Sequence, residues 1–88
     1  MIRRHICFRG RVQGVGFRYR SCRAAEAVGC TGWVRNEYDG SVSMEIQGTE
    51  DQIRQVIQQI EQGRYVRIDS AESCDIPVDE TESGFWAE

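Results

Sequence analysis

The sequence contains no lysine, and all 11 of its strongly basic residues are arginine. This absence excludes Schiff-base chemistry and the phosphate-binding P-loop, because both depend on a lysine side chain. Histidine and cysteine are scarce as well: His5 stands alone, and Cys7, Cys22, Cys30 and Cys74 include no C-x-x-C pair. A metal site would therefore need widely separated thiolates, so we expect neither a bound metal nor any other cofactor.

Long hydrophobic runs are also missing. No segment is apolar enough to cross a membrane, and the basic start MIRRHICF is not followed by the apolar run of a secretory signal. We therefore expect a cytoplasmic protein whose cysteines are free thiols, a disulfide through Cys7 or Cys74 being the minor alternative. The 88 residues suffice for one domain over residues 1–88, which we expect to be a monomer.

Positive charge is concentrated in the first part of the chain. Residues 1–35 hold eight arginines and one acidic residue, Glu26, whereas residues 36–88 hold three arginines and thirteen acidic residues. Such asymmetry indicates an anionic partner for the basic part: nucleic acid, a phosphate metabolite or the acidic part of the same chain.

The apolar pattern predicts the element order βαββαβ. Expected strands cover 2–8, 31–36, 41–47 and 65–69, with a short final strand in 84–88. One expected helix spans 17–28 and ends at Gly29; the other starts at the capping box of Thr49 and Gln52 and stops before Gly63. Alternating strands and helices with one apolar face predict an α+β, ferredoxin-like sandwich, an antiparallel sheet with two helices on one face.

The segment GRVQGVGFR, residues 10–18, lies between the first strand and the first helix. Its glycines allow successive main-chain N–H groups to turn inward, and the helix adds its own unpaired N–H groups and positive dipole end. Arg18 then stands where its guanidinium can close over an anion. A dinucleotide fingerprint would need glycine where Tyr19 stands. From spacing alone, a tight connection with a solvated arginine is an equally good interpretation.

Three segments closely resemble the acylphosphatase family: GRVQGVGFRY at 10–19, GWVRN at 32–36 and DGSV at 39–42. The resemblance extends over nearly the whole chain, and it implies a small hydrolase that splits the carboxyl-phosphate bond of acyl phosphates. By this resemblance Arg18 holds the phosphoryl group and Asn36 positions the attacking water. The resemblance also implies a main-chain phosphate cradle formed by Gln13, Gly14, Val15, Gly16, Phe17 and Arg18.

The residues themselves are compatible with this chemistry. The carboxylate of an acyl phosphate leaves easily, so hydrolysis needs charge stabilisation and an oriented water but neither a strong acid nor a metal. The alternative is a non-catalytic anion-sensing or RNA-binding module, since RNA-recognition domains share the βαββαβ order. Such a sheet would present basic and aromatic side chains on its third strand, where Ser41, Ser43, Glu45 and Gln47 stand instead. We therefore expect a small-molecule substrate and no nucleic acid.

Overall fold

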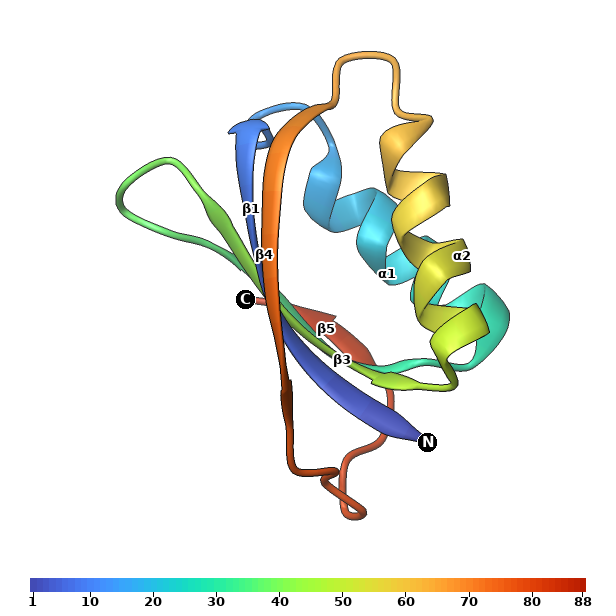
Figure 1. Cartoon of the computed structure of the whole chain (residues 1–88). Coiled ribbons are helices and arrows are strands. Elements are labelled where there is room, and N and C mark those ends of the chain that lie inside the picture. The colour runs from blue at the N-terminus through green and yellow to red at the C-terminus, as the bar shows by residue number, and fades with distance from the viewer.

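Five strands and two helices follow one another in the predicted order in a computed structural model that describes all 88 residues (Figure 1). The elements are β1 (Ile2–Arg11), α1 (Phe17–Val28), β2 (Thr31–Asn36), β3 (Val42–Gly48), α2 (Glu50–Glu61), β4 (Arg67–Ile76) and β5 (Phe85–Ala87). Neither helix has the length and apolar composition needed to span a membrane.

The strands form one sheet in the order β4-β1-β3-β2-β5, and both helices cover the same face of it (Figure 1). All pairs among β1 to β4 are antiparallel, as predicted, so the α+β ferredoxin-like class is confirmed. The short β5 adds a parallel pair with β2, which makes the whole sheet mixed. This pairing follows from the chain path, because the connection after β4 carries the chain to the opposite edge.

Alternation along the central strands builds the core between sheet and helices. Phe8 of β1 and Phe17 of α1 are both buried, with ring centroids 5.0 Å apart. The other buried apolar side chains on the helix side of β1, β2 and β3 and on the inner faces of α1 and α2 are Ile6, Val34, Val42, Met44, Ile46, Ala24, Ala25, Ile53, Val56 and Ile60. The predicted apolar faces of both helices are thereby confirmed.

The two helices begin in different ways. At α2, the Thr49 hydroxyl accepts from the Gln52 N–H at 3.1 Å, and the Gln52 amide oxygen accepts from the Thr49 N–H at 2.8 Å. Acidic residues also stand in the first turn of α2. At α1 the N-cap is Gly16, no side chain caps the helix, and no acidic residue stands in the first turn. The start of α2 is therefore capped by side chains of the protein, and the start of α1 is not.

β4 is longer than the pattern predicted, reaching Ile76 instead of ending near residue 69. It is the outer strand beside β1, and most of its side chains are exposed on both faces. β4 has no continuous apolar face, and it is held in the sheet by its antiparallel pairing with residues Arg3 to Arg11 of β1. The charged residues along it also discourage pairing with another chain.

Candidate active site

The connection from β1 to α1 changes direction at two glycines with positive φ angles. Gly14 has φ 71° and Gly16 has φ 83°, in the left-handed region that side chains rarely adopt. A Cβ at either position would meet no atom within 4 Å, so the backbone angle and not crowding requires glycine there. Val15 lies between them, half-buried against the core, and it anchors the loop.

The loop and the first turn of α1 leave their main-chain donors free. No N–H group from Gln13 through Tyr19 donates a hydrogen bond within the protein, and the next one, of Arg20, donates to the Gly16 oxygen at 3.0 Å. These donors lie at the positive end of the helix dipole, which no acidic side chain offsets. The segment can therefore accept an anion without displacing any contact within the protein.

Arg18 lies exposed in the first turn of α1. Its Nη1 donates to the main-chain oxygen of Glu88 at 3.0 Å, and it forms no ion pair with a carboxylate. Glu88 follows β5, and its N–H donates to the Val34 oxygen at 2.8 Å. The guanidinium is therefore directed toward the edge where β5 meets β2, and its remaining N–H donors are free to bind an anion.

Asn36 is the last residue of β2 and pairs with Val42 of β3. Val34, two residues earlier, and Val42 are both fully buried under the helices, so Asn36 faces the same side. The residue is half-buried, and its carboxamide makes no hydrogen bond within the protein. Its oxygen is therefore free to accept from a water.

The side chain of Gln13 connects the loop to the β2–β3 hairpin. Its Nε2 donates to the main-chain oxygens of Glu37 at 2.7 Å and Ser41 at 2.9 Å. Glu37 directly follows Asn36, so this amide ties the loop to the backbone that carries the asparagine. We predicted Gln13 only as a main-chain member of the cradle, and its side chain is an additional finding.

The hairpin is held internally as well. Asp39 Oδ1 accepts from the Ser41 hydroxyl at 2.6 Å and from the Ser41 N–H at 3.0 Å, and Arg9 pairs with its other oxygen at 3.1 Å. These bonds lower the pKa of Asp39 to about 2, and the bond from the Ser41 hydroxyl has the largest effect. Gly40 has φ 92°, which confirms the predicted turn at Asp39-Gly40.

A surface groove of about 550 Å³ lies elsewhere, between α1 and α2. It touches the loop at Gly16 and is lined by neither Arg18 nor Asn36. A phosphoryl group is small and is bound by converging N–H groups, so it does not require a deep cavity. No group of three or more His, Cys, Asp or Glu side chains is placed to share a metal ion.

The residues singled out from the sequence thus lie around one end of the molecule. Hydrogen bonds link the loop to the hairpin through Gln13, and Arg18 to the β2–β5 edge through Glu88. The part played by Glu88 was missed, and the sequence holds no signal for it, because a main-chain oxygen acts there and its place depends on the β5 pairing. The four cysteines are free thiols.

Comparisons with known proteins show the family to which this fold and sequence belong. The family model for acylphosphatase matches residues 4–86. An acylphosphatase of Bifidobacterium longum is 41% identical over 87 residues, covering 97% of this chain and 90% of that protein. The crystal structure of acylphosphatase from Bacillus subtilis superposes with a TM-score of 0.89 at 28% identity, covering 100% of this chain and 99% of that one. The structure of an acylphosphatase from Coxiella burnetii superposes with a TM-score of 0.86 at 28% identity over 99% of this chain and 92% of that one. The chain belongs to the acylphosphatase family and is an enzyme that hydrolyses acyl phosphates.

Proposed function

We propose that this enzyme hydrolyses the carboxyl-phosphate bond of small acyl phosphates without a metal, at a site formed by the 13–18 loop, Arg18 and Asn36. The observation that carries the proposal is the row of unpaired N–H groups from Gln13 to Tyr19 at an uncapped helix start. The protein leaves this positive end open, whereas it closes the equivalent end of α2 with its own side chains.

The loop and Arg18 bind the phosphoryl group. Main-chain N–H groups donate to its oxygens, and the guanidinium makes a charge-assisted contact with the same group through the N–H donors that the Glu88 oxygen does not occupy. Phosphoryl transfer needs this fixed array of donors because negative charge is spread over the phosphoryl oxygens in the transition state. Donors that are already in place stabilise that charge without reorganisation. The same donors supply the stabilisation for which other phosphatases use metal ions.

Asn36 orients the attacking water. Its carboxamide oxygen accepts a hydrogen bond from the water, which aligns the water oxygen with phosphorus opposite the acyl oxygen. The new oxygen–phosphorus bond forms as the bond from phosphorus to the acyl oxygen breaks. A phosphoryl oxygen takes the proton of the water, and the products are a carboxylate and inorganic phosphate. The departing carboxylate is a weak base, so no side chain has to protonate it.

Gln13 holds these two parts in register. Its bonds to Glu37 and Ser41 keep the hairpin, and with it Asn36, beside the loop that binds the phosphoryl group. A misplacement of the water by about 1 Å costs up to roughly 100-fold in rate, so a rigid link between the two segments matters for turnover.

The test is to separate the roles of Arg18 and Asn36. Arg18→Ala should lower kcat by at least about 100-fold and weaken competitive inhibition by inorganic phosphate, because it removes a charged ligand of the phosphoryl group. Asn36→Ala should lower kcat steeply and leave the phosphate Ki within about 3-fold of the parent, because it removes only the water ligand. Arg23→Ala, an exposed arginine of the same helix, is the matched control and should keep parent kinetics.

Phosphate release from a simple acyl phosphate is measured for all variants, with and without chelator. Arg18→Ala with parent kinetics in a folded protein would show that the phosphoryl group binds elsewhere. Loss of phosphate affinity in Asn36→Ala equal to that in Arg18→Ala would make Asn36 an anion ligand instead of a water ligand. Activity that disappears with chelator and returns with magnesium would contradict the metal-free mechanism. A chain that binds phosphate and releases none would act as a non-catalytic anion-binding module.

A further inference from the structure

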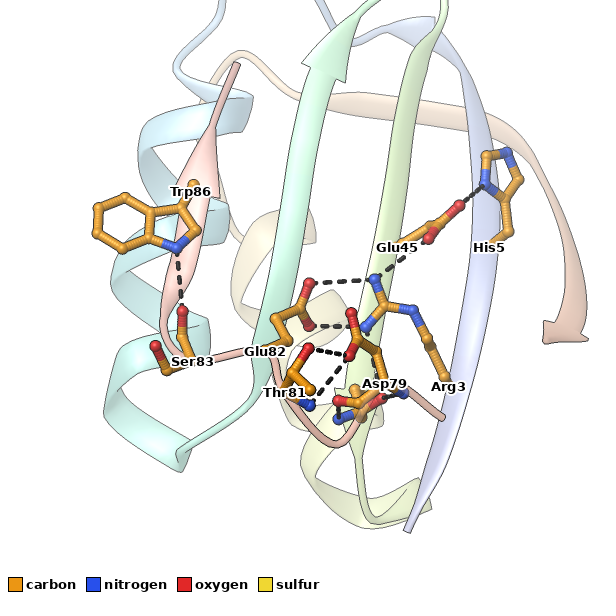
Figure 2. Close-up of polar contacts among 9 residues, drawn as sticks. Arg3, His5, Glu45, Asp79, Thr81, Glu82, Ser83 and Trp86 are labelled. Atoms are coloured by element: carbon orange, nitrogen blue, oxygen red, sulfur yellow. Dashed lines mark hydrogen bonds and ion pairs between the residues drawn. The ribbon is translucent and has the colours of Figure 1, made fainter. Parts of the chain in front are cut away.

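The connection between β4 and β5, residues 77–84, lies on the face of the sheet opposite the helices. It contacts Arg3 through Glu82 (Figure 2) and Gln47 through Asp79. Arg3 and Gln47 alternate with core residues of β1 and β3 and so face away from the helices. Through this connection the chain passes from the β4 edge of the sheet to the β5 edge. Its contacts therefore decide where β5 begins.

Glu82 is the main anchor of the connection. Its two carboxylate oxygens accept from Arg3 Nη1 at 2.6 Å and Nη2 at 3.1 Å, the paired geometry in which arginine binds carboxylates best. The Arg3 side chain is 6% exposed and that of Glu82 is 15% exposed. Glu45 of β3 accepts from the same guanidinium at 3.1 Å and from His5 Nδ1 at the same distance (Figure 2). The hydrogen bonds that Arg3 donates to Glu82, above all, raise the pKa of Arg3.

A second anchor lies a few residues earlier. The Gln47 side chain and the main chain of Asp79 exchange two hydrogen bonds, at 3.0 and 2.8 Å. Asp79 also closes a turn by accepting from the Thr81 N–H and hydroxyl (Figure 2). The chain therefore reaches Glu82 along a defined path.

From Glu82 to Glu88 the chain forms a hydrogen bond to the rest of the protein, or within the segment, every one or two residues. The Trp86 indole N–H donates to the Ser83 oxygen at 3.0 Å (Figure 2), and the Gly84 oxygen accepts from β2 at 3.0 Å. β5 itself has only three residues, too few to hold its own position at the edge of the sheet. The next contact is the Glu88 oxygen, which accepts from Arg18. One short segment thus joins the Arg3–Glu82 pair to Arg18.

We propose that Glu82 is a positioning residue for the hydrolytic reaction: by pairing with Arg3 it fixes β5, and the main-chain oxygen of Glu88 then holds Arg18 in the orientation that receives the phosphoryl group. This inference rests on the proposed role of Arg18 as the phosphoryl ligand. Glu82 itself does not touch the substrate. It lowers the cost of binding by keeping the guanidinium in place before the anion arrives.

The experiment compares Glu82→Ala and Glu82→Gln with the parent in KM, kcat and the Ki of inorganic phosphate. Glu82→Ala should raise KM and the phosphate Ki by roughly 3- to 30-fold, the range of coupling found between linked residues. Glu82→Gln keeps the shape of the side chain and one acceptor, so it folds and shows a smaller effect of the same sign. The matched control is Asp75→Ala, which breaks the exposed Arg4–Asp75 pair of 3.0 Å and should leave all three constants unchanged.

A double-mutant cycle with Arg18→Ala separates positioning from general destabilisation. If Glu82 acts through Arg18, Glu82→Ala should not change the phosphate Ki further once Arg18 is alanine. The Nε–Hε signal of Arg18 in a ¹⁵N–¹H spectrum should also broaden or shift in Glu82→Ala and remain as in the parent in Asp75→Ala.

Parent KM and phosphate Ki in folded Glu82→Ala would overturn the inference, and so would effects that simply multiply in the cycle. Parent kinetics in Arg18→Ala alone would instead overturn the proposed function. The two failures are therefore distinguishable in one set of measurements.

Discussion

Replacing Gln13 by leucine should loosen the link between the loop and the hairpin, because leucine has a similar size and no donor. The change removes the bonds of 2.7 and 2.9 Å to Glu37 and Ser41. Each such bond contributes about 0.5–1.5 kcal/mol to stability. Neither acceptor is left without a partner, because the Ser41 oxygen still accepts from the Glu37 N–H and the Glu37 oxygen from Gly40. The loss should therefore be about 1–2 kcal/mol, at the lower end of the sum.

For a domain of this size, that loss lowers Tm by about 4–16 °C in a calorimetric or circular dichroism melt. We expect kcat to fall by roughly 10- to 100-fold while the phosphate Ki changes by less than about 3-fold, because Asn36 moves but the N–H groups and Arg18 remain. Gln13→Glu should be worse, because it turns carboxylate oxygens toward two carbonyl oxygens. Gln55→Leu, on the exposed side of α2, is the control and should match the parent. A Gln13→Leu enzyme with parent Tm and kcat would refute the reasoning.

Two further predictions concern positions outside the site. Gly32→Ala should abolish cooperative unfolding, because Gly32 has φ 145° and a Cβ there would overlap the main-chain oxygen of Glu45 on β3. The control variant Gly40→Ala, at the open hairpin turn, should have a lower Tm and still fold. A cooperative melt of Gly32→Ala near the parent Tm would contradict this prediction. In thiol labelling at pH 8 followed by mass spectrometry, Cys74 should react first and Cys30 last. Cys74 is exposed, whereas burial raises the pKa of Cys30 to about 11. Early labelling of Cys30 in the native protein would show that its part of the core opens.

Local patterns in the sequence predicted the elements whose reasons lie within a few residues. The capping box of Thr49 and Gln52 marks the start of α2, and Gly29, with φ 84°, ends α1, both as predicted. The alternation of Val42, Met44 and Ile46 predicted a strand with one buried face, which is confirmed. In each case the physical cause is a local hydrogen bond, a backbone angle or a short apolar period, and these act at small sequence separation.

The candidate site divides in the same way. The glycine-rich loop and the placement of Arg18 in the first turn of the helix could be predicted, because glycine permits the positive backbone angles of such a turn and the helix pattern begins at the next residues. The roles of Arg18 and Asn36 remain predictions that kinetics must test. The side-chain bonds of Gln13 could not be predicted, because their acceptors are carbonyl oxygens of a hairpin more than twenty residues away.

The sequence alone therefore determined the helices, the hairpin and the loop that begins α1, since each depends on neighbours along the chain. Only the tertiary structure decided that the polar β4 extends along β1 to Ile76, that β5 pairs in parallel with β2, and that Glu88 meets Arg18. These features carry no apolar period, because an exposed edge strand is held by main-chain hydrogen bonds to its partner. Every residue except proline carries the same main-chain N–H and C=O groups, so the sequence does not indicate which of them form hydrogen bonds with one another. The tertiary fold determines those pairs.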